Sequence, residues 1–349
     1  MSVTAPRRTI FIASPLESEH VDRIRGVDPD RVEVIHLPDI LPPTRYVADQ
    51  YGAPFTRDAD QQRRWNESLA RAEILWDLPP TTTDIARATR LRWIQTTSSG
   101  VGPAVHRLGL ADSDVIITTA RGVHAGPLAE FVFMGLLLHF RGLRHLEAEQ
   151  RAHRWNRYCG QEVAGKTLLT IGAGDLSRGI AQVGRALGMR VIAVTRDPDQ
   201  HRPHAGLFDA LHAASDLPRL LPRADAVVLT LPHTDRTTNM MDDATFAAFK
   251  PGAVFINIGR GQVVDEAALL RHLRSGHIGF AMLDVTAVEP LPADSPLWDL
   301  PNVLISPHSA STVTTENAKI TRIFCDNLRC YLDGRLRDMR NVFDKARMY

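Results

Sequence analysis

The sequence lacks the features that would tie it to a membrane or to a nucleic acid. Its longest unbroken apolar run, Phe131 to Leu138, is much shorter than the roughly 20 residues that a membrane-spanning helix needs. The first residues, MSVTAPRRTIFIASP, contain no long apolar stretch of the kind found in secretory signals. The 41 lysines and arginines nearly balance the 40 aspartates and glutamates, and no segment concentrates one sign. We therefore expect neither a nucleic acid nor an anionic membrane as the main partner.

Cysteine is also scarce. Cys159, Cys325 and Cys330 form an odd set without CxxC spacing, so the sequence predicts neither a disulfide framework nor a zinc site. We expect no metal site among the other side chains either. Together these absences indicate a soluble protein of the reducing cytoplasm.

The residues that are present indicate two domains of the α/β class. The chain has 349 residues, of which 44% are hydrophobic and 23% charged, and one domain takes roughly 150 residues. Apolar strand patterns alternate with helical patterns, which predicts parallel sheets covered by helices on both faces. The strand patterns are Thr9–Ala13, Val32–Leu37, Glu73–Asp77, Arg92–Thr96, Lys166–Ile171, Met189–Thr195, Ala226–Leu231, Ala253–Ile258, Gly279–Val285 and Val303–Ile305.

One long helical pattern, Pro127–Arg151, interrupts this alternation. Its part from Phe131 to Leu138 is apolar on every side, so this part of the helix has to be buried all round. The surface of a single domain rarely covers a helix so completely. We therefore expect a homodimer with two-fold symmetry that forms through the 127–151 helix. An ordinary core helix is the alternative.

A glycine-rich turn follows the strand pattern Lys166–Ile171. Gly172 permits a tight turn, and Gly174 lets main-chain amides approach a pyrophosphate where the next helix begins. Ser177 replaces the third glycine of a GxGxxG fingerprint, which predicts either a small displacement of the helix or a local hydrogen bond of the hydroxyl. A turn that only reverses the chain is the alternative. The residues expected to contact a dinucleotide here are Gly172, Gly174, Asp175, Leu176 and Ser177.

The end of the next strand pattern bears on which dinucleotide is bound. NAD-binding sites carry an acidic residue there for the ribose hydroxyls, but Thr195 stands in that place and Arg196 follows it. A small residue leaves room for a 2′-phosphate, and a guanidinium can bind a phosphate through two hydrogen bonds. These residues favour NADP. Asp197, one position later, leaves NAD open, and Arg196 as a solvated surface charge is the other alternative.

Three later segments place polar residues where strands are predicted to end. They are Phe255–Asp265, Leu283–Pro292 and Asn302–Ala310. The carboxyl ends of parallel strands meet at one edge of a sheet, and ligands bind at this edge. The residues that we expect to converge there around one cofactor are Arg260, Asp284, Glu289 and His308.

In this order the motifs resemble those of the D-isomer-specific 2-hydroxyacid dehydrogenases, the family of the glyoxylate/hydroxypyruvate reductases and of phosphoglycerate dehydrogenase. The resemblance runs from about Leu91 to Gly334 and is faint before Leu91. Besides the three segments above, it rests on Ser98–Val101, Pro127–Glu130 and Leu231–Thr237. For the activity it implies reversible reduction of a small 2-oxo acid by NAD(P)H.

For the fold, the resemblance implies two Rossmann-like, doubly wound parallel-sheet domains. A dinucleotide-binding domain, residues 123–311, would be inserted into a flavodoxin-like substrate domain made of residues 1–122 and 312–349. The active site is then expected in the cleft between the two domains, and closure of that cleft would expel water before hydride transfer.

Three of the residue types fit this chemistry independently of any resemblance. His308 can donate a proton to a carbonyl oxygen, because an imidazole changes its charge near neutral pH. Glu289, hydrogen-bonded to the ring, would orient it and favour its charged form. Arg260 can bind the substrate carboxylate with its planar guanidinium. His308, Glu289 and Arg260 are therefore the predicted catalytic residues.

Further roles follow from the resemblance alone. The amides of Ser99 and Gly100 would complete the carboxylate site, and Asp284 would accept a hydrogen bond from the nicotinamide carboxamide. Independently of the resemblance, Trp76 and Asp77 end the strand pattern Glu73–Asp77. Trp76 is therefore expected either to face the substrate or to lie in the core, and Asp77 in the pocket would disfavour a second acidic group on the substrate. The residues implied to line the cofactor are Leu231, Pro232, Thr237, Ile258 and His308.

Two other functions fit the same motifs. A non-catalytic dinucleotide sensor, similar to the co-repressors that share this fold, would also keep Arg260, Glu289 and His308. A formate- or phosphite-type dehydrogenase is the second alternative, although the formate enzymes carry a glutamine where Glu289 stands.

Overall fold

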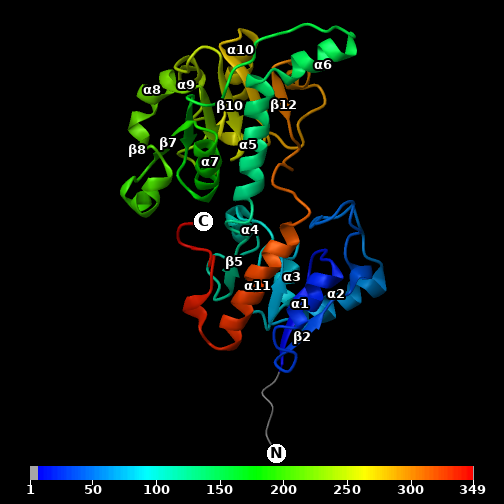
Figure 1. Ribbon diagram of the computed structural model, residues 1–349. Helices are drawn as coiled ribbons and strands as arrows, with labels where there is room; N and C mark the ends of the chain where they lie inside the picture. Colours follow the sequence, from blue (N-terminus) through cyan, green and yellow to red (C-terminus); the bar gives the residue numbers. More distant parts are fainter. Residues whose placement is uncertain (1–6, 349) are drawn as a thin grey trace, which may run out of the picture. The chain divides into compact units, whose positions relative to one another are not determined.

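The computed structural model describes residues 7–348, without the side chains of residues 200–203. The chain forms two compact units (Figure 1). The first comprises Met1–Val123 together with Thr312–Tyr349, and the second comprises His124–Ser311. The chain therefore leaves the first unit near Val123 and returns to it at Thr312.

The first unit is built on a five-stranded sheet in which every strand pairing is parallel. The strand order is β2-β1-β3-β4-β5, which is the flavodoxin-like order of doubly wound sheets. The strands are β1 (Arg8–Ile12), β2 (Val32–Ile35), β3 (Ile74–Trp76), β4 (Trp93–Gln95) and β5 (Ile116–Thr118). The helices are α1 (Ser18–Arg25), α2 (Ala59–Arg71), α3 (Thr82–Arg87), α4 (Gly102–Arg107) and α11 (Glu316–Leu332), with short 3-10 turns at Pro38–Ile40 and Leu336–Asp338.

Helices cover both faces of this sheet because the side chains of its strands are apolar on both sides. Successive side chains of a strand point to opposite faces. Ile12 packs with Ile24 of α1 and Phe324 of α11 on one face. Phe11 packs on the other face against Trp65 of α2, with ring centroids 5.1 Å apart. The two faces together form the core of the first unit.

The second unit is built on a seven-stranded sheet, and its pairings are parallel as well. The strand order is β12-β11-β10-β9-β6-β7-β8. The strands are β6 (Thr167–Ile171), β7 (Arg190–Thr195), β8 (Ala210–Ala213), β9 (Ala226–Leu229), β10 (Ala253–Asn257), β11 (Ile278–Leu283) and β12 (Val303–Ile305). The α-helices are α5 (Ala125–Phe140), α6 (Leu143–Arg151), α7 (Asp175–Ala186), α8 (Leu217–Leu220), α9 (Asp243–Ala247) and α10 (Glu266–Arg274), and 3-10 turns span Asp199–Leu207, Ala214–Asp216, Leu221–Arg223, Gly261–Val263 and Pro296–Asp299.

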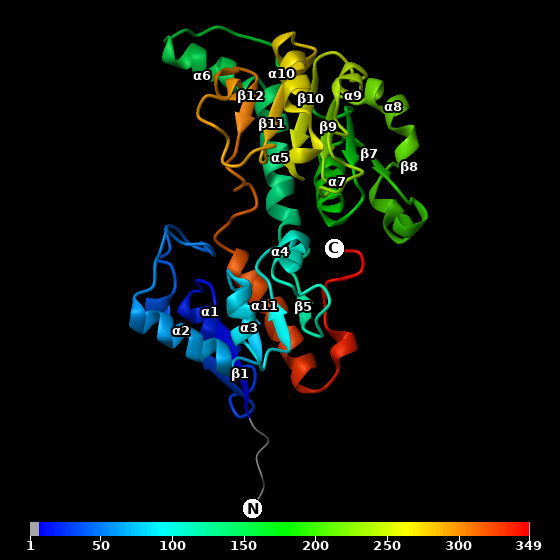
Figure 2. The ribbon, with the colours of Figure 1, turned by 180° about the vertical axis from the view of Figure 1, so that it is seen from behind.

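This sheet, too, is covered on both faces. Side chains of α5 and α7 share one apolar cluster with the strands, and side chains of α8, α9 and α10 share the other. Figure 2 shows the strands β9 to β12 from behind. The chain leaves β6 toward β7 on one side and later returns to β9 on its other side, so the strand order reverses at β6. Dinucleotides bind at such a reversal in open α/β sheets. The predicted fold class is confirmed.

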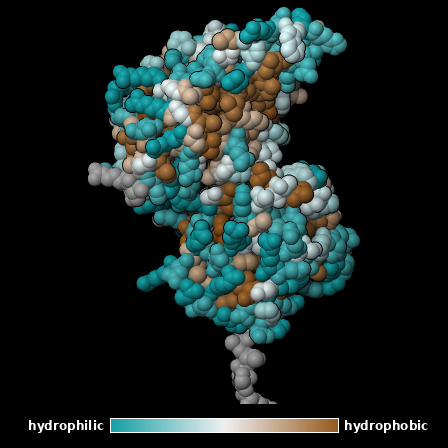
Figure 3. Space-filling view, in the orientation of Figure 1, coloured by the Kyte–Doolittle hydropathy of each residue, from teal (hydrophilic) through white to brown (hydrophobic). Residues whose placement is uncertain are grey.

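The sequence predicts one helix over 127–151, but the structure has two. The chain breaks at Gly142, which has a left-handed φ of 67°, so α5 ends at Phe140 and α6 begins at Leu143. Val132 and Leu136 of α5 are fully buried, but Met134 is 48% exposed and Leu137 39% exposed. The prediction of one continuous helix over 127–151 is therefore wrong. The part from Phe131 to Leu138 is only partly buried within the single chain. Apolar side chains gather on the surface over α5 (Figure 3).

Among the residues that the structure describes, no helix combines the length and the apolar character that crossing a membrane requires. In the same part of the chain, no three His, Cys, Asp or Glu side chains gather closely enough to hold a metal ion.

Candidate active site

The glycine-rich turn lies between β6 and α7, where the strand order reverses. Gly172 has a φ of 117°, and a Cβ atom added to it would lie 2.3 Å from Thr230 Oγ1, so only glycine fits here. A Cβ atom at Gly174 would meet nothing within 4 Å. Gly174 directly precedes α7 as its N-cap residue and has no side chain that could cap the helix. The open side of Gly174 and the helix N-terminus together fit the pyrophosphate of a dinucleotide.

Ser177 does not face this open side. The residue is fully buried, and its Oγ lies 3.0 Å from Thr230 Oγ1, which donates a hydrogen bond to the Ile171 carbonyl oxygen at 2.9 Å. Of the two consequences expected for the missing glycine, the structure shows the local hydrogen bond. Ser177 thus ties α7 to the ends of β6 and β9 through its hydroxyl.

The other two residues of this turn are half-buried at the beginning of α7. The Asp175 carboxylate pairs with the Arg178 guanidinium at 2.6 Å, and Leu176 packs against the apolar cluster that α5 and α7 share. A carboxylate in the first turn of a helix is also favoured by the helix dipole.

Two residues of contrasting exposure follow one another at the end of β7. Thr195 is only 9% exposed and ends the strand, whereas Arg196 is exposed. Arg196 has no hydrogen bond or ion pair with any other residue that the structure describes. Its guanidinium is therefore available to an anion at the edge of the sheet.

The loops after β9 and β10 lie against each other. A Cβ atom at Gly259 would be 2.6 Å from the Leu231 carbonyl oxygen, so these loops touch through their main chains. Pro232 is exposed, and the Thr237 hydroxyl donates to its carbonyl oxygen at 2.9 Å. Ile258 is 4% exposed, and its side chain belongs to the core of the second unit.

His308 and Glu289 form the central pair of the site. His308 Nδ1 lies 2.8 Å from Glu289 Oε2. The Thr286 amide donates to the other carboxylate oxygen at 3.2 Å and so fixes the orientation of Glu289. The imidazole is 48% exposed. Because Nδ1 faces the carboxylate, Nε2 is the ring atom left to act on a substrate.

Asp284 anchors the loop that carries His308. Its Oδ1 accepts hydrogen bonds from Ser306 Oγ at 2.7 Å and from the amides of Ser309 and Ala310 at 2.9 Å. Its carbonyl oxygen accepts from the His308 amide at 2.9 Å. His308 has a φ of 52°, a left-handed conformation that few non-glycine residues adopt. The Asp284 bonds on both sides of His308 hold the loop in this conformation, and Oδ2 of this nearly buried carboxylate has no bond to another described residue.

Arg260 follows β10 in a loop that packs against the loop of Glu289. The guanidinium is half-buried and donates to the Gly259 carbonyl oxygen at 2.7 Å. A Cβ atom at Gly261 would lie 1.9 Å from the Thr286 carbonyl group, so only glycine allows this approach. The glycine beside Arg260 therefore brings the loops of Arg260 and Glu289 together.

Three residues that support this arrangement were not singled out from the sequence. Asn257 Oδ1 accepts from the Gly259 amide at 3.0 Å, and its Nδ2 donates to the Arg260 carbonyl oxygen at 3.2 Å. Glu266 accepts from the Ala287 amide at 2.6 Å, and Gln262 donates to the Ala287 carbonyl oxygen at 3.1 Å. A signal existed for Asn257 alone, because it is a polar residue within an apolar strand pattern.

In the first unit, the loop after β4 carries Ser99 and Gly100, and both are exposed. The loop is tied to its own unit through the Ser98 carbonyl oxygen, which accepts from Thr96 Oγ1 at 2.8 Å and from the Ala120 amide at 3.1 Å. The Ser99 and Gly100 side of the loop thus remains at the carboxyl edge of the sheet.

Trp76 lies in the core. Its side chain is fully buried, and its ring centroid is 5.6 Å from that of Phe324 on α11. Of the two expectations for Trp76, the substrate contact is therefore corrected and the core position is what the structure shows.

Asp77, the next residue, has a left-handed φ of 74°. Its carboxylate accepts from the Leu78 amide at 2.8 Å and from Thr97 Oγ1 at 3.0 Å. Burial raises the pKa of Asp77, and these hydrogen bonds only partly oppose that effect. Asp77 thus lies beside the segment that leads from β4 to Ser99.

Comparison with known proteins identifies the family. Residues 133–310 match the NAD-binding domain of the D-isomer specific 2-hydroxyacid dehydrogenases. The (S)-sulfolactate dehydrogenase of Chromohalobacter salexigens is 36% identical over 242 residues, which are 65% of this chain and 76% of that protein. Glyoxylate/hydroxypyruvate reductase B of Pectobacterium atrosepticum is 32% identical over 259 residues, 73% of this chain and 80% of that protein.

A solved structure agrees with these relatives. The NADPH-dependent glyoxylate/hydroxypyruvate reductase of Sinorhizobium meliloti, in complex with NADP and sulfate, superposes with a TM-score of 0.77 at 26% identity, covering 98% of this chain and all of that one. The chain spans about half the length of the mycobacterial D-3-phosphoglycerate dehydrogenases that it also matches. The chain belongs to the D-isomer specific 2-hydroxyacid dehydrogenases, oxidoreductases that transfer a hydride between NAD(P)H and a 2-oxo or 2-hydroxy acid.

Proposed function

We propose that this chain reduces a small 2-oxo acid with NADPH, and oxidises the D-2-hydroxy acid in reverse, with His308, Glu289 and Arg260 as its catalytic residues. The observation that carries the proposal is the contact of 2.8 Å between His308 Nδ1 and Glu289 Oε2 on a loop that Asp284 anchors. This contact leaves Nε2 of an exposed ring directed away from the carboxylate.

Each of the three residues has a distinct task in this reaction. The bound coenzyme supplies the hydride. Arg260 binds the substrate carboxylate, because its planar guanidinium can offer two parallel hydrogen bonds. His308 donates the Nε2 proton to the carbonyl oxygen as that oxygen gains negative charge, and it takes the proton back in the reverse direction. Glu289 orients the ring through Nδ1.

The coenzyme would be held by the glycine-rich turn and by Arg196. The amides at Gly174 and the first turn of α7 bind the pyrophosphate, and the free guanidinium of Arg196 binds the 2′-phosphate of NADPH. The small, nearly buried Thr195 leaves room for that phosphate. The carboxamide of the nicotinamide would be accepted by Oδ2 of Asp284. The presence of NADP in the Sinorhizobium meliloti reductase supports the preference for NADP.

The substrate would be small or carry a neutral tail. The amides of Ser99 and Gly100 are proposed to bind the substrate carboxylate. The Asp77 carboxylate, next to the same loop, would repel a second acidic group on the substrate. Glyoxylate and hydroxypyruvate fit these limits better than a phosphorylated 2-oxo acid.

A steady-state panel tests this function. Glyoxylate, hydroxypyruvate, pyruvate and 3-phosphohydroxypyruvate are each assayed with NADPH and with NADH. We expect the highest kcat/KM for a small neutral-tailed acid with NADPH. A higher kcat/KM for 3-phosphohydroxypyruvate than for glyoxylate would refute the substrate class. Tight coenzyme binding without turnover of any 2-oxo acid would favour a dinucleotide sensor instead.

The protein is further proposed to act as a two-fold homodimer through residues 127–151. Met134 and Leu137 of α5 and Leu143 and Leu146 of α6 are all at least 39% exposed in the single chain. Burial of such side chains against a second copy would stabilise the dimer by roughly 25 cal/mol per Å² of apolar surface.

Light scattering after size-exclusion chromatography tests the dimer. We expect the mass of a dimer for the wild type and that of a monomer for Leu137→Glu, because a buried carboxylate would have no partner. Leu187→Glu, at an apolar position that is 36% exposed on α7's C-terminal end, is the matched control and should remain dimeric. A monomeric wild type would contradict the proposal.

We also place this activity in the cytoplasm. The three cysteines are free thiols, and the buried Cys325 is not paired with Cys330. Free thiols of this kind persist in a reducing compartment.

A further inference from the structure

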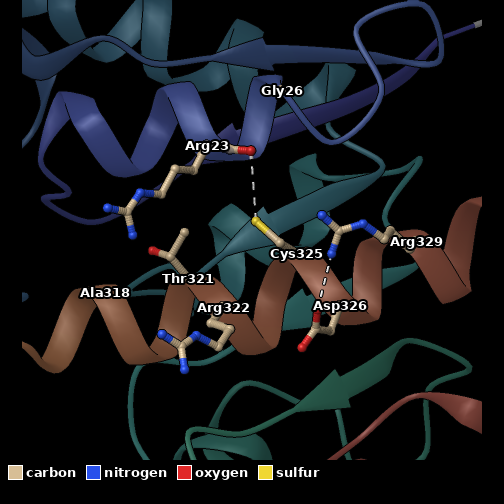
Figure 4. A pocket seen from close by; sticks show the side chains of 8 residues that line it. All are labelled: Arg23, Gly26, Ala318, Thr321, Arg322, Cys325, Asp326 and Arg329. Carbon is tan, nitrogen blue, oxygen red and sulfur yellow. Dashed lines mark hydrogen bonds and ion pairs between the residues drawn. The ribbon is translucent and has the colours of Figure 1, made fainter.

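A groove on the first unit gathers arginines around a buried hydroxyl (Figure 4). It lies between α1 and α11, which pack against each other, and its volume is about 390 Å³. No residue of the candidate active site lines it. The lining residues that bear on its chemistry are Arg23, Thr321, Arg322, Cys325, Asp326 and Arg329.

The charge of the groove is strongly positive for a protein whose net charge is +1. Three guanidinium groups and a single carboxylate line it. Arg329 pairs with Asp326 at 3.0 Å, and Arg23 lies 3.9 Å from Glu19, at the limit of an ion pair. Arg322 has no ion pair with any residue in the described part of the chain. Two of the three cations are therefore free or weakly paired.

The floor of the groove contains a hydrogen-bond donor without a partner. Thr321 is 1% exposed, and its Oγ1 has no hydrogen bond to any residue that the structure describes. A buried hydroxyl without a partner costs free energy of folding, so such groups are rare in folded proteins. Figure 4 shows Arg23 of α1 reaching toward Thr321 of α11. An acceptor atom bound between them could satisfy the hydroxyl and the guanidinium together.

The neighbouring thiol adds no negative charge to this floor. Cys325 is 8% exposed, and burial raises its pKa to about 11. The thiol is therefore neutral at physiological pH, and its Sγ lies 3.9 Å from the Arg23 carbonyl oxygen. The floor thus carries no negative charge, and the rest of the lining holds three guanidinium groups and the Asp326 carboxylate.

We propose that this groove binds a small dianion, with Arg322 and Arg23 as its cationic contacts and the Thr321 hydroxyl as its hydrogen-bond donor. A guanidinium binds a phosphate or a carboxylate through paired, charge-assisted hydrogen bonds. Arginines that come from two different helices favour a ligand that offers oxygens in two directions, which a phosphate or a dicarboxylate does and a single carboxylate does not. The site is independent of the function proposed above, because His308, Glu289 and Arg260 belong to the second unit.

Isothermal titration calorimetry at constant ionic strength tests this site, with inorganic phosphate, pyrophosphate and succinate as three separate probes. In the Arg23→Ala/Arg322→Ala double variant we expect at least a tenfold loss of affinity for the probe that binds best. Arg90→Ala removes an exposed arginine of the same unit outside the groove and should change the affinity less than twofold. Because Arg196 and Arg260 are unchanged in these proteins, the difference reports on the groove alone.

Two further variants separate binding from folding. Asp326→Asn removes the carboxylate and frees Arg329, so we expect severalfold tighter binding. Thr321→Val keeps the shape of the side chain and should weaken binding severalfold without lowering the melting temperature, because the hydroxyl has no partner to lose. Preference for phosphate or for succinate would identify the ligand as a phosphate compound or as a dicarboxylate. Equal affinities of the wild type and the double variant, or no binding of any probe to the wild type, would overturn the proposal.

Discussion

Two basic side chains follow strands of the same seven-stranded sheet, and they differ in how firmly they are held. His308 follows β12, contacts Glu289 at 2.8 Å and sits on a loop that Asp284 fixes through its Oδ1 and its carbonyl oxygen. Arg196 follows β7, is exposed and has no partner among the described residues. A proton donor has to be positioned next to the reacting oxygen before the reaction begins. A guanidinium that binds a phosphate can instead change its conformation when the phosphate arrives. His308 is thus fixed, as a proton donor has to be, and Arg196 is unpaired, as suits a group that binds a phosphate.

The largest effect on activity is expected from a substitution of His308. In His308→Asn the turnover rate with a small 2-oxo acid and NADPH should fall by about 100- to 10,000-fold, the range typical for loss of a general acid. Asparagine tolerates the left-handed φ of 52° at this position, so the loop should keep its shape. Stopped-flow or steady-state measurement of NADPH oxidation gives the turnover rate, and coenzyme titration should show an unchanged Kd. A variant that retains more than a tenth of the wild-type rate would remove His308 from the chemistry.

A substitution of Arg196 should affect only the choice between NADPH and NADH. Arg196→Ala is expected to weaken NADPH binding by about 10- to 100-fold, because charge-assisted hydrogen bonds to the 2′-phosphate are lost. NADH binding should change less than twofold. Arg190→Ala, which removes an exposed arginine from the opposite end of β7, is the matched control and should leave both affinities unchanged. Fluorescence titration with the two coenzymes measures their Kd values. An equal loss of affinity for NADPH and NADH would contradict the 2′-phosphate contact.

A third residue of the site is held so firmly that it should affect stability alone. Ser177→Ala removes the hydroxyl that lies 3.0 Å from Thr230 Oγ1. We expect the free energy of unfolding to fall by about 1 kcal/mol, the usual net worth of one hydrogen bond. Chemical denaturation measures this loss. The Kd for NADPH should stay within twofold because Ser177 is fully buried; a fivefold weaker Kd at unchanged stability would restore Ser177 to the cofactor site.

The smallest effect is expected in the first unit, at Asp77, and it depends on pH. Burial raises the pKa of this carboxyl above its unfolded value, so its charged form destabilises the folded state at neutral pH. Asp77→Asn should therefore stabilise the protein at pH 7 by roughly 1 kcal/mol or less. The gain should shrink as the pH falls through the raised pKa and vanish below the unfolded value. Melting temperatures of both proteins between pH 7 and pH 3.5 measure this, and a gain that grows toward acid pH would contradict the assignment.

Much of the site could be predicted because its residues follow short apolar strands directly. His308 comes soon after Val303–Ile305, and Gly172 comes directly after Thr167–Ile171. Parallel strands end at a common edge, so residues that follow them are brought together by the strand order. The supporting residues were harder to find. No local sequence pattern distinguishes Glu266. Its carboxylate accepts a hydrogen bond from the Ala287 amide, which belongs to a different loop.

Two features of the sequence were each compatible with more than one structure. Trp76 ends a strand near the substrate edge, but its indole turns toward α11, a segment from the far end of the chain. The apolar run within 127–151 resembled one continuous buried helix, but Gly142 breaks it in the left-handed conformation. For Trp76, the contact with Phe324 from the far end of the chain accompanies the core position. For the apolar run, the break is local and lies at Gly142.

The sequence by itself determined the two doubly wound sheets, the phosphate-binding turn and the identity of the proposed catalytic residues, because hydrophobic periodicity and glycine at strand ends are local properties. Only the tertiary structure decided which polar groups are already satisfied and which remain available. It committed Ser177 to Thr230 and Asp284 Oδ1 to the His308 loop, and it left Arg196 and the Thr321 hydroxyl without partners among the described residues. Hydrogen-bond satisfaction depends on groups that meet only after the chain has folded, so no local pattern of residues can specify it.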